Sequence, residues 1–291
     1  MNGVSPLCLK SANFAANFKQ KIMVYRVLVL DIDGTLTNSK KEITDATKRA
    51  LRQAQERGVK VVLASGRPTP GIVPLADELE LGRFGGFILS FNGAVVTNYQ
   101  TKEVVFETTL PLSEIPSLYK SSQEYGVSIV TYKDDAIISE NVDNEYVSIE
   151  ARINKMPVVE VDDFVKTVTK PVTKCLMVGD GDYMAQVEKQ VNELFGDRLN
   201  VYRSEPFFLE IMPRNVDKAY SLGKLLEHLG MTKEEMVACG DGFNDLSMIK
   251  YAGLGVAMGN AQPVVKESAD YITLTNDEDG VASVVDEFIL N

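Results

Sequence analysis

The sequence predicts an α/β fold, a doubly wound parallel sheet of Rossmann-like type with a smaller α+β domain inserted into it. The first observation is the uninterrupted apolar run Val27–Leu30, which is typical of a central strand buried on both faces. The second is that two carboxylates, Asp31 and Asp33, follow this strand directly and precede Gly34. Open α/β sheets hold their sites at the carboxyl ends of their strands, so we expect the site here.

After the first strand, helical and strand patterns alternate. Val59–Ala64 predicts a second buried strand, and Phe87–Phe91 predicts a third, and each ends in a polar loop that contains glycine. A crossover helix lies between the first two strands, and its apolar residues recur at helical spacing up to a glycine stop: Ile43, Ala46, Ala50, Leu51, Ala54 and then Gly58. This alternation predicts parallel strands.

The same alternation returns near the end of the chain. Thr232 and Glu235 form a capping-box pattern, and Met236–Cys239 predicts a strand that runs into the polar loop Gly240–Asp245. Two last strands are predicted at Leu254–Met258 and Tyr271–Leu274. A helix is predicted before the capping box, because apolar residues recur there at helical spacing up to a glycine stop: Ala219, Leu222, Leu225, Leu226, Leu229 and then Gly230.

Between these two parts lies a region of different pattern, with short alternating stretches such as Val127–Tyr132 and Cys175–Val178 mixed with amphipathic helices. We therefore predict three parts, given by residue number: a core, 23–93 and 206–291; an inserted α+β domain, 94–205; and an N-terminal extension, 1–22. The extension has no signal-peptide pattern, and we expect it to be disordered, with either Met1 or Met23 as the true start.

Composition excludes several classes of protein. The 291 residues are 45% hydrophobic and 24% charged, as in an ordinary soluble globular protein. The formal net charge of −11 argues against nucleic acid or an anionic membrane as a partner, and no apolar run approaches the length of a membrane span. Cys8, Cys175 and Cys239 are too few and too far apart for a disulfide framework or a zinc site, which favours a reducing cytoplasm.

Polar side chains suited to phosphoryl transfer stand where these strands and helices meet loops. Alone, Asp-x-Asp-Gly is an ordinary turn, Ser65 a loop serine and Lys218 a solvated charge. Together with the Gly240–Asp245 loop they supply a nucleophile, a proton shuttle and positive charge, which transfer of a phosphoryl group requires. We predict that Asp31 attacks phosphorus, and that Asp33 protonates the leaving alcohol and then activates water.

These motifs resemble the haloacid dehalogenase superfamily of phosphohydrolases, and specifically its Cof-like branch of sugar-phosphate phosphatases. The matching motifs occur in the family's order: DIDGT at Asp31–Thr35, ASGR at Ala64–Arg67, RNVDK at Arg214–Lys218 and GDGFND at Gly240–Asp245. The resemblance covers residues 23–291 and implies the same roles for Asp31 and Asp33. It implies a core with an inserted α/β cap domain that selects the substrate.

The resemblance also implies a Mg²⁺ site and a phosphate site. Its metal ligands are the carboxylates of Asp31 and Asp241 and the backbone carbonyl of Asp33, all of them the oxygen donors that Mg²⁺ prefers. Asp245 is expected to hold Lys218 or a metal-bound water. The groups expected to hold the phosphate are the amides of Gly34 and Thr35, the loop residues Ser65 and Gly66, the Lys218 ammonium and Asn244.

The inserted domain is expected to close over the site and to choose the leaving group. Arg67, Asn92 and Gly93 are predicted at the rim, where they contact the substrate, although Arg67 is equally suited to pair with an acidic neighbour. Within the insertion, four residues are candidates for contact with the leaving group: Tyr132, Arg152, Tyr202 and Arg203.

Two further features look functional but are expected to be structural. The loop Gly179–Asp182 resembles a metal loop, yet it lies inside the insertion without a following Asn-Asp, so we predict a strand-to-helix turn. His228, the single histidine, lies in a helix far from the motifs, which argues against a histidine-dependent phosphatase or a serine triad.

The sequence therefore predicts a Mg²⁺-dependent phosphatase that acts on a small phosphorylated metabolite, most simply a sugar phosphate. A phosphomutase that uses the same aspartyl-phosphate remains an alternative, because motifs do not report how well the cap excludes water. A sensing module without turnover is a second alternative, disfavoured because Asp31, Asp33, Ser65, Lys218 and Asp241 are all present. Dehalogenation, which uses the same nucleophile, is a weaker alternative. A second carboxylate two residues after Asp31, at Asp33, and a carboxylate for Mg²⁺ both suit phosphoryl transfer better.

Overall fold

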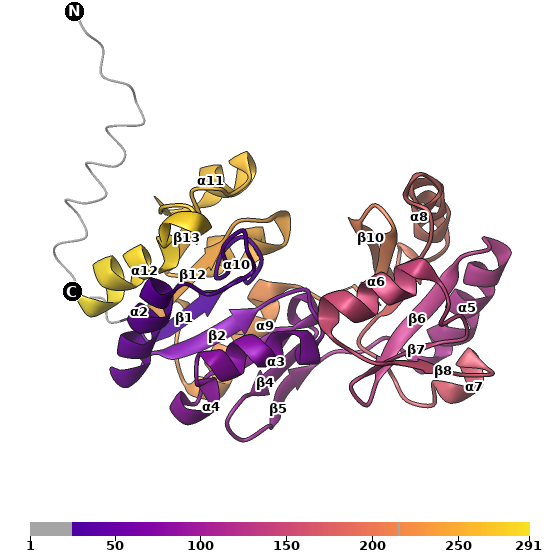
Figure 1. Ribbon diagram of the computed structural model, residues 1–291, viewed down its shortest axis with the longest axis horizontal. Coiled ribbons are helices and arrows are strands. Elements are labelled where there is room, and N and C mark those ends of the chain that lie inside the picture. Colours follow the sequence, from indigo (N-terminus) through magenta and orange to yellow (C-terminus); the bar gives the residue numbers. More distant parts are fainter. Residues whose placement is uncertain (1–24, 215) are drawn as a thin grey trace, which may run out of the picture.

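The computed structural model describes residues 25–214 and 216–291, and within them two sheets form two units side by side (Figure 1). The predicted α/β fold with a largely parallel sheet is confirmed. The extension expected at residues 1–22, and the choice of Met1 or Met23 as the start, lie outside the described residues.

The core unit is built on the larger sheet, whose strand order is β14-β13-β12-β1-β2-β3-β4-β5. Neighbours from β14 to β3 run parallel, whereas β4 and β5 extend the sheet as antiparallel strands. The strands are β1 (Val27–Leu30), β2 (Lys60–Ala64), β3 (Phe87–Ser90), β4 (Val95–Asn98), β5 (Val104–Glu107), β12 (Met236–Gly240), β13 (Leu254–Ala257) and β14 (Tyr271–Ile272).

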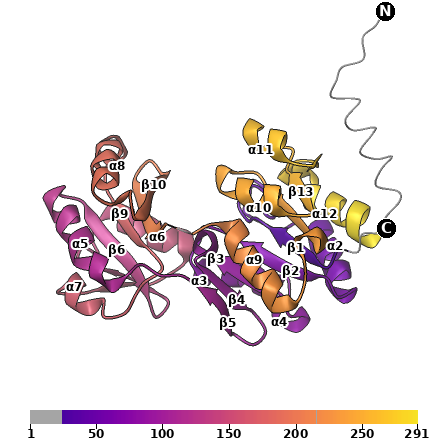
Figure 2. The ribbon, with the colours of Figure 1, turned by 180° about the vertical axis from the view of Figure 1, so that it is seen from behind.

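Helices cover both faces of this sheet, α2 and α3 on one face and α9 on the other (Figures 1 and 2). Gly230 ends α9 in the left-handed conformation, with φ of 63°, as its sequence position predicts. No helix in residues 25–214 or 216–291 is long and apolar enough to cross a bilayer. The core helices are α2 (Asp45–Glu56), α3 (Thr69–Glu78), α4 (Leu81–Phe84), α9 (Lys218–Leu229), α10 (Leu246–Tyr251), α11 (Pro263–Ser268) and α12 (Gly280–Val285).

The second unit is built on a mostly antiparallel sheet with strand order β10-β11-β9-β6-β7-β8. Its strands are β6 (Ser128–Lys133), β7 (Ala136–Ser139), β8 (Val158–Glu160), β9 (Cys175–Val178), β10 (Leu199–Glu205) and β11 (Phe208–Pro213). Its helices are α5 (Ile115–Glu124), α6 (Glu145–Asn154), α7 (Phe164–Thr167) and α8 (Gly181–Phe195).

The division between the sheets differs from the predicted boundaries at residues 94 and 206. Strands β4 and β5 pair with β3 in the core sheet, although we expected them in the insertion. Strand β11 pairs with β9 and β10 in the second sheet, although we expected it in the core. The reason is that short alternating strands have the same appearance at the edge of a parallel sheet as in an antiparallel one.

A shared apolar cluster joins the two units. Phe91 and Val95, from the core, pack with residues of the second unit that include Tyr132, Leu176 and Phe208. The rings of Phe91 and Tyr132 meet edge to face with their centres 5.4 Å apart, a favoured geometry for aromatic pairs. This cluster lies beside the carboxyl edge of the core sheet, where β1, β2, β3 and β12 all end.

Candidate active site

A buried ammonium group forms the centre of the site. Lys218 begins α9 and is 1% exposed, yet its Nζ donates three hydrogen bonds. Two go to the carboxylates of Asp31, at 2.8 Å, and Asp245, at 2.6 Å, and the third goes to the carbonyl of Ala64, at 2.8 Å. A buried cation requires such pairing, so Lys218 draws together the ends of β1 and β2 and the loop after β12.

Asp245 anchors that loop with both of its carboxylate oxygens. Its Oδ1 accepts from Lys218, and its Oδ2 accepts from the backbone N–H groups of Asp241 and Gly242, each at 3.0 Å. Gly240 is needed beside it, because a Cβ there would lie 2.5 Å from the Cβ of Asp245. The expected contact of Asp245 with Lys218 is thus present in the structure.

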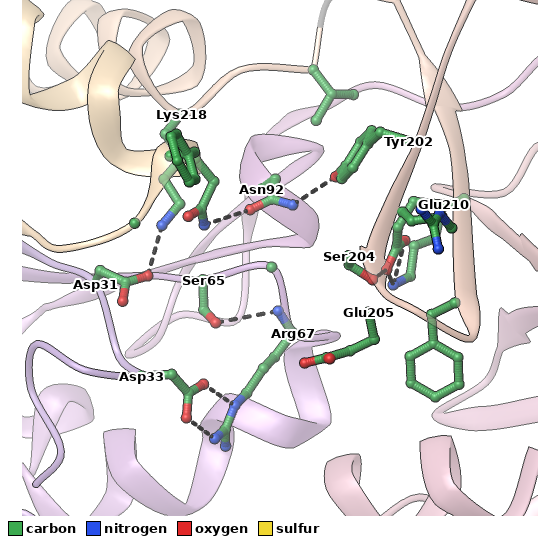
Figure 3. Close-up of a pocket in the computed structure, with 18 of the residues that line it drawn as sticks. Asp31, Asp33, Ser65, Arg67, Asn92, Tyr202, Ser204, Glu205, Glu210 and Lys218 are labelled. Atoms are coloured by element: carbon green, nitrogen blue, oxygen red, sulfur yellow. Dashed lines mark hydrogen bonds and ion pairs between the residues drawn. The ribbon is translucent and has the colours of Figure 1, made fainter. Parts of the chain in front are cut away.

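Asp31 lies at the carboxyl end of β1 on the cavity wall, and Figure 3 shows one of its oxygens joined to Lys218 and the other without a drawn interaction. Burial and the neighbouring charge of Asp245 raise the pKa of the Asp31 carboxyl, and Lys218 opposes this rise. Since Lys218 contacts Oδ1, the described residues leave Oδ2 available for a ligand or a reacting atom.

Asp241 lies against the loop that follows Asp31. Its Oδ1 accepts from the Thr35 hydroxyl at 3.1 Å, and a Cβ on Gly34 would lie 2.4 Å from its Oδ2. Gly34 also has φ of 88°, which favours glycine, so this close approach depends on the absence of a side chain. Burial and the charge of Asp245 raise the pKa of Asp241 to about 6.

The residues present fit a hard divalent cation. Asp31, Asp241 and Asp245 each offer a carboxylate oxygen, and these oxygens lie within 4.8 Å of one another. Lys218 balances only one of three negative charges, and oxygen is the donor that Mg²⁺ prefers. Because both oxygens of Asp245 already accept hydrogen bonds, Asp31 and Asp241 are the carboxylates that would hold the ion. The predicted third ligand, the backbone carbonyl of Asp33, belongs to the loop packed against Asp241.

Asp33 has surroundings very different from those of Asp31. Arg67 donates to it from Nε at 2.9 Å and from a terminal nitrogen at 2.7 Å, and Lys41 donates at 2.8 Å. Although burial acts in the opposite direction, the hydrogen bonds from Arg67 and Lys41 hold the pKa of the Asp33 carboxyl below its usual range. Arg67 was expected either to contact the substrate or to pair with an acidic neighbour, and the structure shows the pairing, with Asp33.

A chain of amide and hydroxyl groups connects the core site to the second unit. Asn244 donates from Nδ2 to Oδ1 of Asn92 at 3.2 Å, and Asn92 donates from its own Nδ2 to the Tyr202 hydroxyl at 2.9 Å. Asn92 adopts a left-handed backbone with φ of 54°, which turns its side chain at the end of β3. The predicted rim residue Asn92 therefore contacts the second unit directly.

These groups surround a cavity of about 840 Å³ between the two units. The predicted residues on its wall are Asp31, Asp33, Ser65, Gly66, Arg67, Asn92, Lys218, Asp241 and Asn244, together with Tyr202 and Arg203 from the second unit. Gly34, Thr35 and Asp245 are not among the described wall residues, although Thr35 and Asp245 are buried and hydrogen-bond to Asp241. The Oγ of Ser65 accepts from the Arg67 N–H at 3.2 Å, and its own proton remains free to donate.

The predicted rim residue Gly93 and two of the candidate residues, Tyr132 and Arg152, are not among the described residues that form the cavity wall. Gly93 is buried beneath α9, where its carbonyl accepts from Ser221 Oγ at 2.5 Å, and it is not part of the cavity wall formed by the described residues. Tyr132 is buried behind that wall, and its hydroxyl donates to Glu150. Arg152 is exposed on α6 and lies off the wall.

Sequence reasoning missed most of the inserted unit's contribution to the cavity. The wall includes Glu150, Asn154, Lys174, Ser204, Glu205, Phe208 and Glu210. One signal was available, because Glu210 stands inside the apolar strand β11 and a buried carboxylate needs a partner. That partner is Lys174, whose Nζ lies 2.9 Å from Glu210 Oε2.

Both features expected to be structural lie away from the cavity. Asp180 caps α8 by accepting from the Tyr183 N–H at 3.2 Å, so Gly179–Asp182 is the predicted strand-to-helix turn. His228 is exposed in the last turn of α9 and is not part of the cavity wall.

Comparison with known proteins identifies the family. A model of haloacid dehalogenase-like hydrolases matches residues 28–285. This chain belongs to the haloacid dehalogenase-like hydrolases. The predicted family and enzyme class are thereby confirmed. Among curated proteins, this hydrolase is similar to 5-amino-6-(5-phospho-D-ribitylamino)uracil phosphatase YcsE of Bacillus subtilis, with 33% identity over 91% of this chain and 96% of that protein.

Solved structures agree with this family. This haloacid dehalogenase-like hydrolase is similar to one from Bacteroides thetaiotaomicron, with 54% identity, a TM-score of 0.86 and coverage of 90% of this chain and 98% of that chain. It is also similar to a sugar phosphatase of haloacid dehalogenase subclass IIB, with 28% identity, a TM-score of 0.74 and coverage of 90% and 98%.

Replacing Lys218 by Met should destabilise the fold by about 3–5 kcal/mol, because it leaves buried carboxylates without their cation. The loss of folding free energy should be greater at pH 8 than at pH 5. Without the ammonium that opposes it, the rise in the pKa of Asp31 is larger in the folded state, which then binds more protons than the unfolded chain, so the stability of the variant falls as pH rises.

Urea unfolding at both pH values measures this difference. Lys224→Met is the matched control, since Lys224 is a partly exposed lysine of the same helix that forms an ion pair with Glu227. Equal stability of the Lys218 variant and the control would contradict the central role of Lys218.

Mg²⁺ binding should weaken as pH falls below about 6, by about tenfold per pH unit for each proton displaced, because protonated Asp241 is a poor ligand. The raised pKa of Asp31 extends this dependence to higher pH. Calorimetric titration with Mg²⁺ at pH 5 and pH 7.5 tests it, and Asp241→Asn should bind weakly at both. An affinity that does not change with pH would count against these ligands.

Proposed function

We propose that this protein is a Mg²⁺-dependent phosphatase that hydrolyses a small phosphorylated metabolite through an aspartyl-phosphate on Asp31. The single observation that carries the proposal is the Asp31 carboxylate, held through one oxygen by buried Lys218 beside Asp241 at the wall of a large cavity. A nucleophile fixed in this way leaves its second oxygen for attack, and a nearby excess of carboxylates suits a cation that binds phosphate.

The proposed reaction has two displacements at phosphorus. A carboxylate oxygen of Asp31 forms a bond to phosphorus while the bond from phosphorus to the alcohol oxygen breaks, and Asp33 gives that oxygen a proton. Water then attacks phosphorus as Asp33 takes its proton, and the bond to Asp31 breaks to release phosphate. Bound Mg²⁺ supplies positive charge to the phosphate oxygens, a role in which Lys218 assists from the protein side.

Two carboxylates can perform different steps only if their surroundings differ. Asp31 is buried beside a lysine and two carboxylates, whereas Asp33 is half-buried and contacts Arg67 and Lys41. To act as an acid, Asp33 has to take up a proton, and the partner that it then leaves is Lys41, an exposed side chain away from the cavity wall formed by the described residues. We infer that this exchange accompanies substrate binding.

We also propose that the second unit acts as the cap that selects the leaving group. Its helix α6 and its strands β10 and β11 contribute wall residues opposite Asp31, and Tyr202 reaches the core through Asn92. The relatives support a phosphorylated polyol or sugar as substrate, since one is named for a phosphoribityl compound and another is described as a sugar phosphatase. The buried free thiols of Cys175 and Cys239 are compatible with a reducing cytoplasm.

Asp31→Asn should lower kcat by at least about a thousandfold, because the nearly isosteric amide is a poor nucleophile. The measurement is phosphate release from sugar phosphates, nucleotides and an aryl phosphate, with Mg²⁺ or with a chelator. The wild type should require Mg²⁺ with every active substrate. Unchanged circular dichroism of the variant provides the folding control.

Near-wild-type turnover by Asp31→Asn would overturn the proposed mechanism. Turnover that appears only when a sugar bisphosphate is added would instead favour the phosphomutase alternative. Absence of phosphate release from a folded, Mg²⁺-binding protein would favour a sensing module.

A further inference from the structure

Each positively charged side chain on the cavity wall, within the described residues, already contacts a carboxylate. This leaves no unpaired cation for a second anionic group on the substrate once the reacting phosphate is bound. The pairs are Arg67 with Asp33 at 2.7 Å, Lys174 with Glu210 at 2.9 Å, Arg203 with Glu188 at 2.9 Å, and Lys218 with both Asp31 and Asp245 at 2.8 and 2.6 Å.

One carboxylate on the same wall has no partner. Glu205 stands at the end of β10, is exposed, and makes no hydrogen bond or ion pair through its side chain among the described residues. Figure 3 shows its side chain extending from the cap side of the cavity toward the side that holds Arg67. It lies beside Ser204, whose hydroxyl donates to Glu210 at 2.9 Å.

A second unsatisfied acceptor lies on the wall at the end of α6. Asn154 is 2% exposed, and its side-chain oxygen accepts no hydrogen bond among the described residues, although its nitrogen donates to the Glu150 carbonyl at 3.0 Å. This oxygen lies near α3, 3.0 Å from where a Cβ on Gly71 would stand. Because this oxygen is itself buried between α6 and α3, the cavity does not present it to a ligand, and Glu205 is the acceptor on the wall that a leaving group can reach.

We propose that Glu205 is a specificity-determining residue that selects a leaving group rich in hydroxyl or other hydrogen-bond donors and without a second anionic group. This inference rests on the proposed phosphatase function and names the substrate class of the same site. Glu205 accepts hydrogen bonds from the leaving group and repels a carboxylate or second phosphate brought to the cap side of the cavity. The reacting phosphate, placed beside Asp31 by the proposed mechanism, lies on the opposite side of the cavity from Glu205.

A matched pair of substrates isolates this effect. Sorbitol 6-phosphate and 6-phosphogluconate differ only at the far carbon, which carries a hydroxymethyl group in one and a carboxylate in the other. The wild type should favour sorbitol 6-phosphate in kcat/KM by at least about tenfold. Glu205→Gln should reduce this ratio, and Glu205→Lys should reduce it further by supplying an unpaired cation.

The ratio of the two kcat/KM values is the measured quantity, so a general loss of activity in a variant cancels. Glu160→Gln is the control, because Glu160 is an exposed carboxylate on β8 away from the cavity wall, and its ratio should equal that of the wild type. Folding of each variant is checked by thermal unfolding.

Three results would overturn the proposal. An unchanged ratio in both Glu205 variants means that Glu205 does not sense the charge of the leaving group. An equal loss of kcat/KM for both substrates means that Glu205 acts through another group, such as Arg67. A wild-type preference for 6-phosphogluconate contradicts the charge argument itself. If p-nitrophenyl phosphate is hydrolysed in these cases, the proposed function stands while this inference fails. If no phosphate ester is hydrolysed, both the proposed function and this inference fail.

Discussion

The rest of the site depends on one interaction, the buried ammonium of Lys218 between the carboxylates of Asp31 and Asp245. An ammonium group taken out of water is stable only when it is paired, and this pairing fixes three separate stretches of chain around one point. Asp245 in turn holds the backbone of the loop that carries Asp241. The proposed nucleophile Asp31, the candidate metal ligand Asp241 and the buried Lys218 thus share one network, so disturbance of one member changes the charge balance of the others.

The same arrangement gives Asp31 and Asp33 the different surroundings that their proposed roles require. Asp31 is buried beside other carboxylates, and both conditions raise its pKa in the metal-free protein. Hydrogen bonds from Arg67 and Lys41 instead lower the pKa of Asp33 and favour its ionised form. A divalent cation beside Asp31 offsets the excess of negative charge there and favours its nucleophilic form. Asp33 is free of that network and can exchange its partners for a proton. Separation of the two environments is what an acid and a nucleophile in one site require.

The core was predictable because its signals are local and strong. Buried apolar strands, the glycine stop Gly230 and the carboxylates at strand ends each follow from a few neighbouring residues, and the motif order joined Asp31 to Lys218 across the chain. The cap side was predicted poorly for the opposite reason. Glu205 and Asn154 reach the cavity only through the pairing of β10 with β11 and the placement of α6. Gly93 was misplaced because a glycine after a strand has the same local pattern whether it faces substrate or packs under a helix.

The proposed mechanism requires a covalent bond between Asp31 and the substrate's phosphoryl group, and this bond can be observed directly. Enzyme mixed with substrate and Mg²⁺ is quenched in acid within one turnover, digested, and analysed by mass spectrometry for the peptide that contains Asp31. The account predicts a transient phosphoryl adduct on Asp31 that disappears as phosphate is released and never forms in Asp31→Asn. Rapid phosphate release without any adduct on Asp31, or with the adduct on another residue, would contradict it.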